Sequence, residues 1–537
     1  MAVNPTEVEL RLWLAPEDII TLRNHPHFPG SRDHTHEVLD SIYFDSDDRF
    51  LRDHGYNLRL RHIDGKCVQT IKSTDQGVGL FERSEWEQTI EGEEPDFSGV
   101  NNASLGRILI DDVRSALKPV FETRFERTAY QLNSNGADIV MAIDEGQILV
   151  TDTSRPISEI ELELKHGNPT ALFKIAREII DIVPAELGFK SKSERGYELA
   201  EQTAVSAETA SDPELNAGMG AGRAFTLVCR ACLRHLAANV PLILGHDGNA
   251  LHQMRVALRR LRAAISVFSA VVADERAETI KVELSWLARE LGPARDLDTL
   301  LIEVIKPLRQ RYINEPGLVS ISNTFTRKRL KSYRLAQEAV QSVRFRKLVL
   351  DAVEWVEAGT WSSSDDALMC ARRDVPVEIY ASEQLSRRYK RIRRRGPIMG
   401  TLDPEQLHRL RIQVKKARYA TEFFSGVYIG KKSVKQCKKA KTSLRQLQNY
   451  LGRLNDIATH KALIVDIINR HAGGLKEEQS RRRAFAAGLV IGDQQARIQK
   501  LLDRSRKAHC RFERVKAFWK LPSRSNAVAA PAAEEQP

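Results

Sequence analysis

Charged residues alternate with apolar ones in several short runs of this chain. The runs 7–11 (EVELR) and 159–165 (EIELELK) carry acids and one base at every second position, while 57–61 (NLRLR) and 81–87 (FERSEWE) add more bases. Side chains on a strand point alternately to its two faces, so each run places its charges on one face. Several such strands indicate a closed sheet with a charged interior. Clustered carboxylates need a cation and clustered bases need an anion, so a metal-bound polyanion would satisfy both.

The chain divides into an acidic half and a basic half. Its 537 residues suggest two or three domains. The net charge of +11 hides a charge of −15 over residues 1–205 (22 Lys+Arg, 37 Asp+Glu) and of +26 over residues 206–537 (60 and 34). Two halves of opposite charge imply two roles. The basic half is expected to attract a polyanion such as nucleic acid, polyphosphate or an anionic membrane.

The period of the apolar residues changes from strand-like to helix-like along the chain. Strands are predicted at 6–12, 38–44, 56–63, 67–72, 80–90, 122–132, 138–143, 147–151 and 157–165. Turn signals such as Asn135-Gly136 and Glu145-Gly146 separate several of them. A helix is predicted over 169–183 and long helices over 223–520. The small, polar segment 202–222 is expected to be a linker, and 521–537 a disordered tail.

Compartment is indicated by the cysteines and by the hydropathy pattern. The six cysteines are scattered, and Cys229 and Cys232 form a single CxxC without the second pair that a zinc site requires. We therefore expect buried thiols there. The N-terminus does not resemble a signal peptide, and we expect no apolar run of the ~20 residues that a membrane span needs. The expected location is the cytoplasm, with no membrane partner.

The helical region contains an internal repeat. Four residues recur at the same relative offsets roughly 160 residues later: His252, Arg255, Arg259 and Arg262 correspond to His408, Arg411, Lys415 and Arg418. The spacing keeps each set on one helix face. The segments 287–298 and 447–458 also correspond, with Gly and Asp at matching positions. Two similar helical bundles are predicted, over about 223–375 and 376–520.

These motifs resemble two known families. Residues 1–201 are similar to the CYTH domain of the triphosphate tunnel metalloenzymes, because the ExExK signature corresponds to EVELR at 7–11 and further motifs follow in the family's order. These are NLRLR at 57–61, QTIK at 69–72, FERSEWE at 81–87, FETRFER at 121–127, AIDEG at 142–146, EIELELK at 159–165 and SKSERGY at 191–197. Residues 223–520 resemble the CHAD domain, and the combination resembles bacterial inorganic triphosphatases. The implied fold is α+β: a closed antiparallel β-barrel, or tunnel, with flanking helices, then an all-α domain of two similar bundles.

The resemblance implies hydrolysis of inorganic triphosphate to diphosphate and phosphate with Mg²⁺ or Mn²⁺. Substrate contacts are assigned to Arg59, Arg61, Lys72, Arg83, Arg124 and Lys192; catalysis to Arg11, Glu85 and Glu87; and metal binding to Glu7, Glu9, Asp144, Glu161 and Glu163. Because Glu159, Glu161 and Glu163 point the same way, spacing leaves open which of them are ligands. Arg11 stands where the signature has lysine, and its planar fork replaces a compact point charge.

For the helical region the resemblance implies binding of inorganic polyphosphate. The expected contacts are His252, Arg255, Arg259, Arg262, His408, Arg411, Lys415 and Arg418. Nucleic acid is a less favoured partner, because only 7% of the residues are aromatic and they form no stacking platform. The alternatives are hydrolysis of thiamine triphosphate or nucleoside triphosphates, an adenylate cyclase, and a polyphosphate-binding protein without activity. The expected location includes polyphosphate granules, and the oligomeric state is left open.

Overall fold

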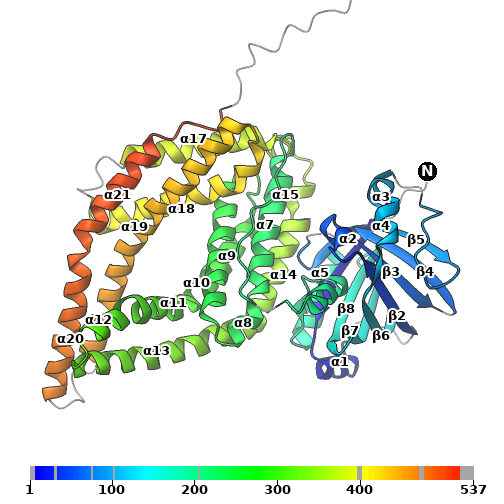
Figure 1. Cartoon of the computed structure of the whole chain (residues 1–537), viewed down its shortest axis with the longest axis horizontal. Helices are drawn as coiled ribbons and strands as arrows, with labels where there is room; N and C mark the ends of the chain where they lie inside the picture. The colour runs from blue at the N-terminus through cyan, green and yellow to red at the C-terminus, as the bar shows by residue number, and fades with distance from the viewer. Residues whose placement is uncertain are drawn as a thin grey trace, which may run out of the picture.

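The computed structural model describes residues 6–28, 33–63, 65–73, 77–100, 103–203, 206–395, 402–470 and 477–520. A β-barrel with short helices is followed by a ring of long helices beside it (Figure 1). The predicted tail 521–537 lies outside the described residues. The predicted α+β architecture, a closed barrel followed by an all-α domain, is therefore confirmed.

Eight antiparallel strands close the barrel in the order β5-β4-β3-β2-β6-β7-β8-β1, and β1 pairs with β5 to complete it. Their bounds are β1 (Thr6–Trp13), β2 (His34–Asp45), β3 (Tyr56–Ile63), β4 (Lys66–Ser73), β5 (Leu80–Ile90), β6 (Lys118–Ser134), β7 (Ala137–Val150) and β8 (Thr153–His166). A two-residue strand, β9 (Glu186–Leu187), pairs with β1 on the outside. Closure leaves no free edge among these eight strands and creates an interior that every strand reaches at alternate positions.

One predicted turn is a continuous strand. The runs 138–143 and 147–151 form the single strand β7, which passes through Gly146. A Cβ at Gly146 would lie 2.2 Å from the carbonyl oxygen of Arg124, so glycine allows the β6 backbone to approach closely. The turn predicted at Asn135-Gly136 is confirmed, because both residues adopt positive φ (54° and 76°) between β6 and β7.

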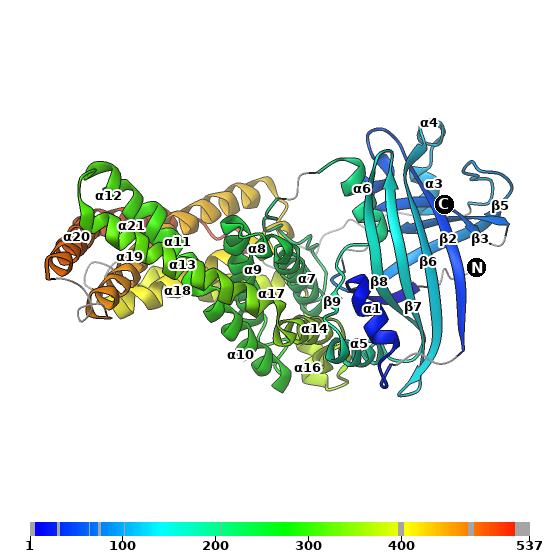
Figure 2. The same cartoon turned by 90° about the horizontal axis from the view of Figure 1, so that it is seen from below.

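Short helices flank the barrel: α1 (Pro16–Arg23), α2 (Phe50–Asp53), α3 (Ala103–Ile108), α4 (Asp111–Ser115), α5 (Thr170–Ile182) and α6 (Lys192–Ala200). The amphipathic α5 buries Leu172, Ile175 and Ile179, the face expected from the sequence. Helix α6 lies on the side of the barrel that faces the helical domain (Figure 2). Its N-terminal residues Lys192 and Ser193 are buried, and they lie at the barrel interior.

The helical domain contains two sets of helices, as the repeat predicted. Those of the first set are α7 (Ala221–Ala238), α8 (Val240–Leu244), α9 (Gly248–Val267), α10 (Glu275–Glu290), α11 (Gly292–Thr299), α12 (Lys306–Arg311), α13 (Pro316–Gln341), α14 (Val343–Ala358), α15 (Thr360–Ser363) and α16 (Ala367–Arg373), with a π-helical turn η1 (Leu300–Ile305). Those of the second are α17 (Val377–Arg395), α18 (Pro404–Phe423), α19 (Lys431–Arg470), α20 (Glu477–Ala496) and α21 (Ile498–Glu513), with a 3₁₀ turn η3 (Phe424–Val427). The repeat-bearing helices α9 and α18 pack against each other.

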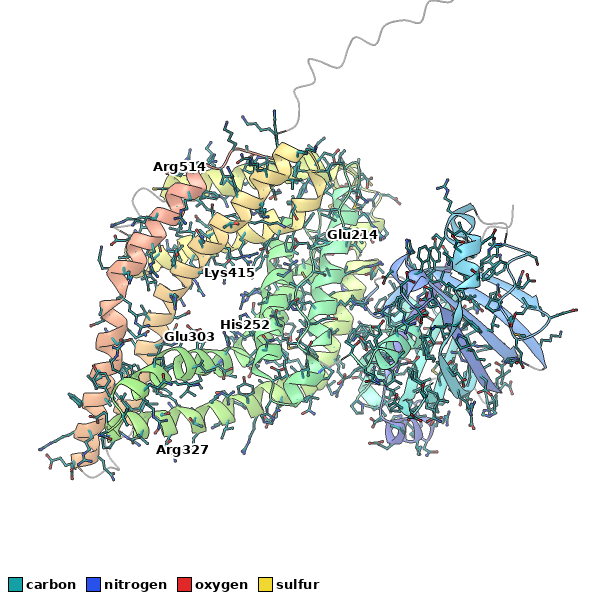
Figure 3. All side chains as sticks on the ribbon, viewed as in Figure 1. Glu214, His252, Glu303, Arg327, Lys415 and Arg514 are labelled. Carbon is teal, nitrogen blue, oxygen red and sulfur yellow. The ribbon has the colours of Figure 1, made fainter. Side chains whose placement is uncertain are left out.

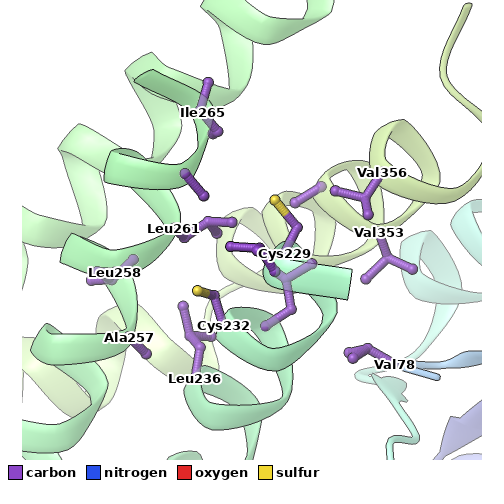
Figure 4. Packing of buried hydrophobic residues seen from close by; sticks show 14 of the residues in the cluster. Val78, Cys229, Cys232, Leu236, Ala257, Leu258, Leu261, Ile265, Val353 and Val356 are labelled. Carbon is purple, nitrogen blue, oxygen red and sulfur yellow. The ribbon is translucent and has the colours of Figure 1, made fainter. Parts of the chain in front are cut away.

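One stretch of the helical domain is more apolar than the sequence analysis expected. Residues 221–244, which form α7 and α8, are long and apolar enough to cross a membrane by length and composition alone. However, 61% of the tested window is buried in the protein. Cys229 and Cys232 of α7 are buried among Leu236, Leu258 and Leu261, as Figure 4 shows, and both thiols are free. The apolar residues of α7 thus belong to the protein core, and the predicted buried thiols are confirmed.

The two domains share an interface and a section of one core. Val78 of the barrel domain belongs to the same buried cluster as Val353 and Val356 of α14 (Figure 4). At the rim, Arg177 of α5 donates to Asp351 at 2.6 Å and to Glu354 at 2.9 Å. Packing between α5 and α14 therefore fixes the helical domain against the outside of the barrel.

The described residues of the predicted linker form no helix or strand between α6 and α7, and they pack on the helical domain. Leu215 is only 2% exposed. The carbonyl oxygen of Ser211 accepts from Arg260 at 2.8 Å, and Asp212 pairs with Lys441 at 2.8 Å. Residues 206–220 therefore act as a docked connection rather than as a free spacer.

Candidate functional site

The barrel interior contains a highly polar cavity of about 230 Å³. Seven of the eight barrel strands, all but β7, and the start of α6 contribute to its lining: Glu7, Glu9, Arg11, Tyr43, Asn57, Arg59, Arg61, Lys72, Arg83, Glu85, Arg127, Glu161, Glu163, Lys165, Ser191, Lys192 and Ser193. Apart from the ring of Tyr43, the residues of this lining are polar or charged. The alternating runs therefore place their charges inside, as the sequence predicted.

The arginines of the cavity are only partly satisfied by the groups around them. Among the described residues Arg61 has no ion pair, and its guanidinium donates to Ser41 Oγ at 2.9 Å. Burial, followed by repulsion from Arg59 and Arg127, lowers the pKa of Arg61 to about 9. The Nε–H groups of Arg59 and Arg83 are buried without a hydrogen-bond partner. An anion in the cavity would relieve both the repulsion and the unsatisfied donors.

Two phenylalanine rings hold these cations in place. The guanidinium groups of Arg11 and Arg83 lie 4.9 and 4.6 Å from the ring centre of Phe81. Phe125 lies below Arg61, Arg127 and Lys192, at 5.7, 5.7 and 5.0 Å. Such cation–π contacts fix the direction of each base without using up its N–H donors. The donors therefore stay directed at the cavity.

A buried cluster of carboxylates surrounds the ammonium of Lys192. Its Nζ lies 2.6 Å from Asp144, 2.5 Å from Glu159 and 3.0 Å from Glu161. The oxygens of these three acids lie within 4.8 Å of one another, close enough to bind a metal ion. Burial alone would raise the pKa of Glu161, but Lys192, Arg127 and Arg11 hold it well below its ordinary value. Lys192 and the arginines thus compensate the charge of this cluster.

Glu7 of β1 and Glu163 of β8 are two further carboxylates of the cavity lining. Burial raises the pKa of Glu163, and the neighbouring charge of Glu7 raises it further. Each acid pairs with one lysine, Glu7 with Lys72 at 2.8 Å and Glu163 with Lys165 at 2.5 Å. Carboxylate oxygens such as these are ligands that hard divalent cations accept. A cation held there would neutralise phosphate oxygens and lower the pKa of a bound water.

Arg11, the departure from the signature, is a buried brace. It is 2% exposed, and it contacts Glu9 at 2.5 Å and Glu161 at 3.2 Å. It also donates to the carbonyl oxygen of Lys190 at 3.3 Å. Burial alone would lower the pKa of Arg11, but Glu9, Glu161 and Glu159 raise it. A lysine could not make these contacts together, since they use the separate arms of the guanidinium fork.

Three of the predicted residues, Glu87, Arg124 and Asp144, lie outside the cavity lining. Arg124 is on the outer face of β6, where its side chain is 58% exposed and pairs with Asp40 and Glu122. Its assignment to the tunnel wall is therefore wrong, because Phe121, Phe125 and the intervening Thr123 occupy the inward positions of β6. Glu87 lies beside the cavity, half-exposed, and accepts from Thr70 at 2.9 Å.

Of the remaining predicted acids, Asp144 lies behind the cavity, whereas Glu9 and Glu85 line it. Asp144 is fully buried behind the cavity and accepts from Arg127 at 2.6 and 2.7 Å, so its oxygens are already engaged. Glu9 lines the cavity but pairs with Arg11 and Arg83. Glu85 lines it too, and contacts Lys72 at 3.0 Å and Arg59 at 3.9 Å.

The sequence analysis did not assign Arg127 and Tyr43 to the site. The inward-facing alternation Phe121, Phe125 leads to Arg127, so the period of β6 could have identified it. Tyr43 is inward on β2, and although burial would raise its pKa, Arg59 and Arg61 lower it. No sequence pattern distinguishes a tyrosine that faces two arginines, such as Tyr43, from a tyrosine of the apolar core.

In the helical domain, bases from α9 and α18 face each other on the inner side of the ring, where Figure 3 shows His252 and Lys415. Burial, followed by repulsion from Arg411, Arg259, Arg255 and Arg262, lowers the pKa of Lys415 to about 7. We call these five bases, Arg255, Arg259, Arg262, Arg411 and Lys415, the basic cluster. The repeat thus brings both copies of the motif together.

Two of the five bases in the basic cluster, Arg255 and Arg411, have an acid close by among the described residues. Arg255 contacts Asp296 at 4.0 Å, and Asp456, the equivalent acid of the second repeat, lies close enough to Arg411 to affect its pKa. Among the described residues, Arg259, Arg262 and Lys415 form no ion pair. The centre of the cluster therefore carries uncompensated positive charge in a partly buried position.

The other predicted contacts of the helical domain differ in their surroundings. Burial and then the charges of Arg295, Arg259 and Arg255 lower the pKa of His252 to about 4, so its ring is neutral near pH 7. The exposed ring of His408 contacts Asn455 Oδ1 at 2.8 Å. Arg418 is engaged by Gln448 at 2.7 Å and by Glu422 at 2.8 Å, which leaves it fewer free donors than its neighbours on α18.

Comparisons with known proteins identify both domains. The CYTH domain model matches residues 5–197 and the CHAD domain model matches residues 227–465. An inorganic triphosphatase from Haemophilus influenzae is 33% identical over 199 residues, which cover 36% of this chain and 54% of that protein. The match thus spans about half the length of this curated relative.

Solved structures similar to the chain include proteins with each domain. The CHAD domain from Ricinus communis has 27% identity and a TM-score of 0.49, over 58% of this chain and 98% of that chain. A putative adenylyl cyclase from Hippeastrum, described as having a dominant triphosphatase activity, has 18% identity and a TM-score of 0.29, over 36% and 95%. The identification rests on the two family models: the chain consists of a CYTH domain followed by a CHAD domain.

Proposed function

We propose that the CYTH domain hydrolyses inorganic triphosphate to diphosphate and phosphate with a divalent cation. The observation that carries this proposal is Arg61, a buried guanidinium that donates to Ser41, has no acid partner among the described residues and has a pKa lowered to about 9. A cation in this state is stabilised by an anion. A small anion of high charge suits a polar cavity of about 230 Å³ with this many bases.

The residues of the cavity supply what phosphoryl transfer requires. Arg59 and Arg83, whose Nε–H groups have no partner in the protein, and Arg61, which has no ion pair among the described residues, would bind phosphate oxygens. Hydrolysis breaks one P–O–P bridge and forms a P–O bond to water, so charge accumulates on the leaving diphosphate, where fixed arginines stabilise it. Glu85, held by Lys72 at 3.0 Å, is a carboxylate positioned to orient the water and accept its proton.

Selection of inorganic triphosphate over a nucleotide follows from the lining. The base of ATP or the thiazolium of thiamine triphosphate needs apolar or aromatic surface, and the described lining offers only the ring of Tyr43. The walls can therefore recognise phosphates but provide no platform for an organic group. We expect the same cavity to accept ATP more weakly than triphosphate.

Phosphate release from triphosphate, ATP, thiamine triphosphate and long-chain polyphosphate tests the substrate directly. Each is assayed with Mg²⁺, with Mn²⁺ and with EDTA. We expect metal-dependent release that is fastest with triphosphate. Faster release from ATP or thiamine triphosphate, or formation of cyclic AMP, would replace the proposed substrate. No release from any of them would leave a protein that only binds.

For the CHAD domain we propose binding of inorganic polyphosphate on the basic cluster. Its support is the group of three bases, Arg259, Arg262 and Lys415, that form no ion pair among the described residues, with repulsion lowering the pKa of Lys415. A flexible chain of phosphates can cross from α9 to α18 and neutralise bases of both repeats. Polyphosphate bound in this way would locate the protein at cytoplasmic polyphosphate.

Binding of fluorescent polyphosphate as a function of salt measures this second activity. Each neutralised phosphate releases a counterion, so affinity should fall steeply with salt concentration. An Arg259→Gln/Lys415→Gln variant should bind much more weakly and keep the triphosphatase rate. Single-stranded RNA of equal charge is the competitor, and stronger binding of RNA would contradict the proposal.

A further inference from the structure

We propose that the CHAD domain completes the tunnel site, with Arg234 of α7 acting as a positioning residue for Lys192. This inference rests on the proposed triphosphatase function. Helix α7 belongs to the CHAD domain, whereas Lys192 begins α6 of the CYTH domain and lines the cavity. A chain of direct contacts joins the two residues across the domain interface.

The first contact clamps the segment that precedes α6. The Nη1 group of Arg234 donates to the carbonyl oxygen of Phe189 at 3.2 Å. Its Nη2 group forms a short ion pair with Glu194 Oε1. The side chains of Arg234 and Glu194 are 24% and 31% exposed, so water screens the pair only partly. One guanidinium therefore binds both ends of residues 189–194.

Glu194 passes this constraint to the start of α6. Its second oxygen, Oε2, accepts from the backbone N–H of Ser191 at 2.8 Å, while Ser191 Oγ accepts from the backbone N–H of Glu194 at 3.1 Å. This capping box fixes the first turn of the helix. Burial would raise the pKa of Glu194, but Arg234 and then the Ser191 N–H lower it. The carboxylate that caps α6 is thus kept ionised by the CHAD domain.

The first turn of α6 reaches the cavity. Ser191, Lys192 and Ser193 all line it, and Lys192 holds the three buried carboxylates from the centre of their cluster. From the opposite side Arg11 donates to the carbonyl oxygen of Lys190 at 3.3 Å. Residues 189–194 are therefore fixed between one arginine of the tunnel and one arginine of the CHAD domain.

Another contact across the same interface provides a comparison. Arg177 of α5 pairs with Asp351 and Glu354 of α14, and its side chain is 34% exposed. Its partners and those of Arg234 have no residue in common, and α5 supplies no residue to the cavity. Loss of Arg177 weakens the interface, whereas loss of Arg234 weakens the interface and also releases the cap of α6.

Displacement of a positioning group by about 1 Å can reduce turnover on the order of 100-fold. Because Arg11 still holds Lys190 in the Arg234→Gln variant, we expect a smaller loss, roughly tenfold in kcat/KM for triphosphate. Since Arg234 lowers the pKa of Glu194, the variant should also lose activity at a higher pH on acidification. Polyphosphate binding should stay unchanged, because the basic cluster lies on other helices.

The test is a double-mutant cycle in the full-length protein. Arg234→Gln, Glu194→Gln and the double variant are compared for kcat, KM and the acid limb of the pH profile, with Arg177→Gln as the control and Arg234→Lys as the charge-conserving variant. If Arg234 acts through Glu194, the double variant loses little more than either single variant, and Arg177→Gln keeps the wild-type rate. Thermal unfolding of every variant identifies losses that come from instability.

The outcomes separate the inference from the proposed function. Multiplying losses in the double variant, a wild-type rate in Arg234→Gln, or an equal loss in Arg177→Gln each overturn the positioning role while the wild type stays active. An inactive wild type overturns the proposed triphosphatase, and with it the reaction that Arg234 would support.

Discussion

The replacement Lys192→Met tests the most tightly coupled region of the barrel. The side chain of Lys192 is 8% exposed, and its ammonium contacts Asp144, Glu159 and Glu161 at 2.5–3.0 Å. Methionine has nearly the same length but removes the charge. Each acid keeps an arginine, Asp144 and Glu161 through Arg127 and Glu159 through Arg195, but the cluster loses the group at its centre.

Removing one partner of a buried ion pair costs about 3–5 kcal/mol. In a domain of this size 1 kcal/mol lowers the unfolding temperature by about 2–4 °C, so the transition of the CYTH domain should fall by about 6–20 °C. Differential scanning calorimetry measures it. Lys190→Met is the matched control, because this half-buried lysine of the same segment pairs with Glu198 and its loss should cost about 1 kcal/mol or less.

The effect should also depend on pH. The pKa values of Glu159 and Glu161 are lowered in the folded protein by Lys192 and the neighbouring arginines, against the effect of burial. Stability from a lowered carboxylate pKa is present above the unfolded value of 4.5 and is lost as pH falls through the folded value. The difference between wild type and variant should therefore be constant near neutral pH and shrink below about pH 4.5. A Lys192→Met transition equal to that of Lys190→Met at neutral pH would refute this reasoning.

Three further predictions follow from the placement of single residues. Arg124→Gln should change kcat/KM for triphosphate less than about twofold, whereas Arg127→Gln should lower it at least tenfold, because only Arg127 contacts the cavity; equal losses would contradict the assignment. The pKa of Lys415 is lowered to about 7 without ligand, and a bound polyanion should raise it. Polyphosphate binding at pH 8 should therefore take up a proton and weaken as the pH rises. Calorimetry in buffers of different ionisation enthalpy detects the proton uptake. Burial and Glu7 raise the pKa of Glu163, and a cation bound to this carboxylate would compete with its proton, so saturating Mg²⁺ should shift the acid limb of the rate profile to lower pH. An acid limb at the same pH with and without Mg²⁺ would place the cation elsewhere.

The barrel and its charged interior were predictable because they depend on a local rule. Alternation with period two sends every second side chain inward, and the runs at Glu7 and Glu161 follow it without interruption. The same rule explains the error at Arg124: the assignment followed the motif order, whereas the inward face of β6 is set by its phenylalanines and leads to Arg127. The repeat in the helical domain was predictable for a similar reason, since helix spacing alone groups its bases.

The partners of the charges could not be predicted in this way. The sequence shows that Asp144 and Glu161 are acidic and inward, but their pairing with Lys192 depends on how α6 enters the barrel. That arrangement depends on contacts between residues far apart in the sequence, including Arg234 and Glu194 across the domain interface. For the same reason, spacing did not indicate that the oxygens of Asp144, Glu159 and Glu161 come within 4.8 Å of one another.

The most direct test of the central claim, a metal-dependent triphosphatase inside the barrel, is the rate of phosphate release from triphosphate by Glu7→Gln. The matched control is Glu122→Gln, which makes the same change on the outer face of β6, where Glu122 is half-exposed beside Arg124. We predict that Glu7→Gln loses most of the Mg²⁺-dependent rate at an unchanged unfolding temperature and that Glu122→Gln keeps it. A wild-type rate in Glu7→Gln, or equal losses in both variants, would contradict catalysis in this cavity.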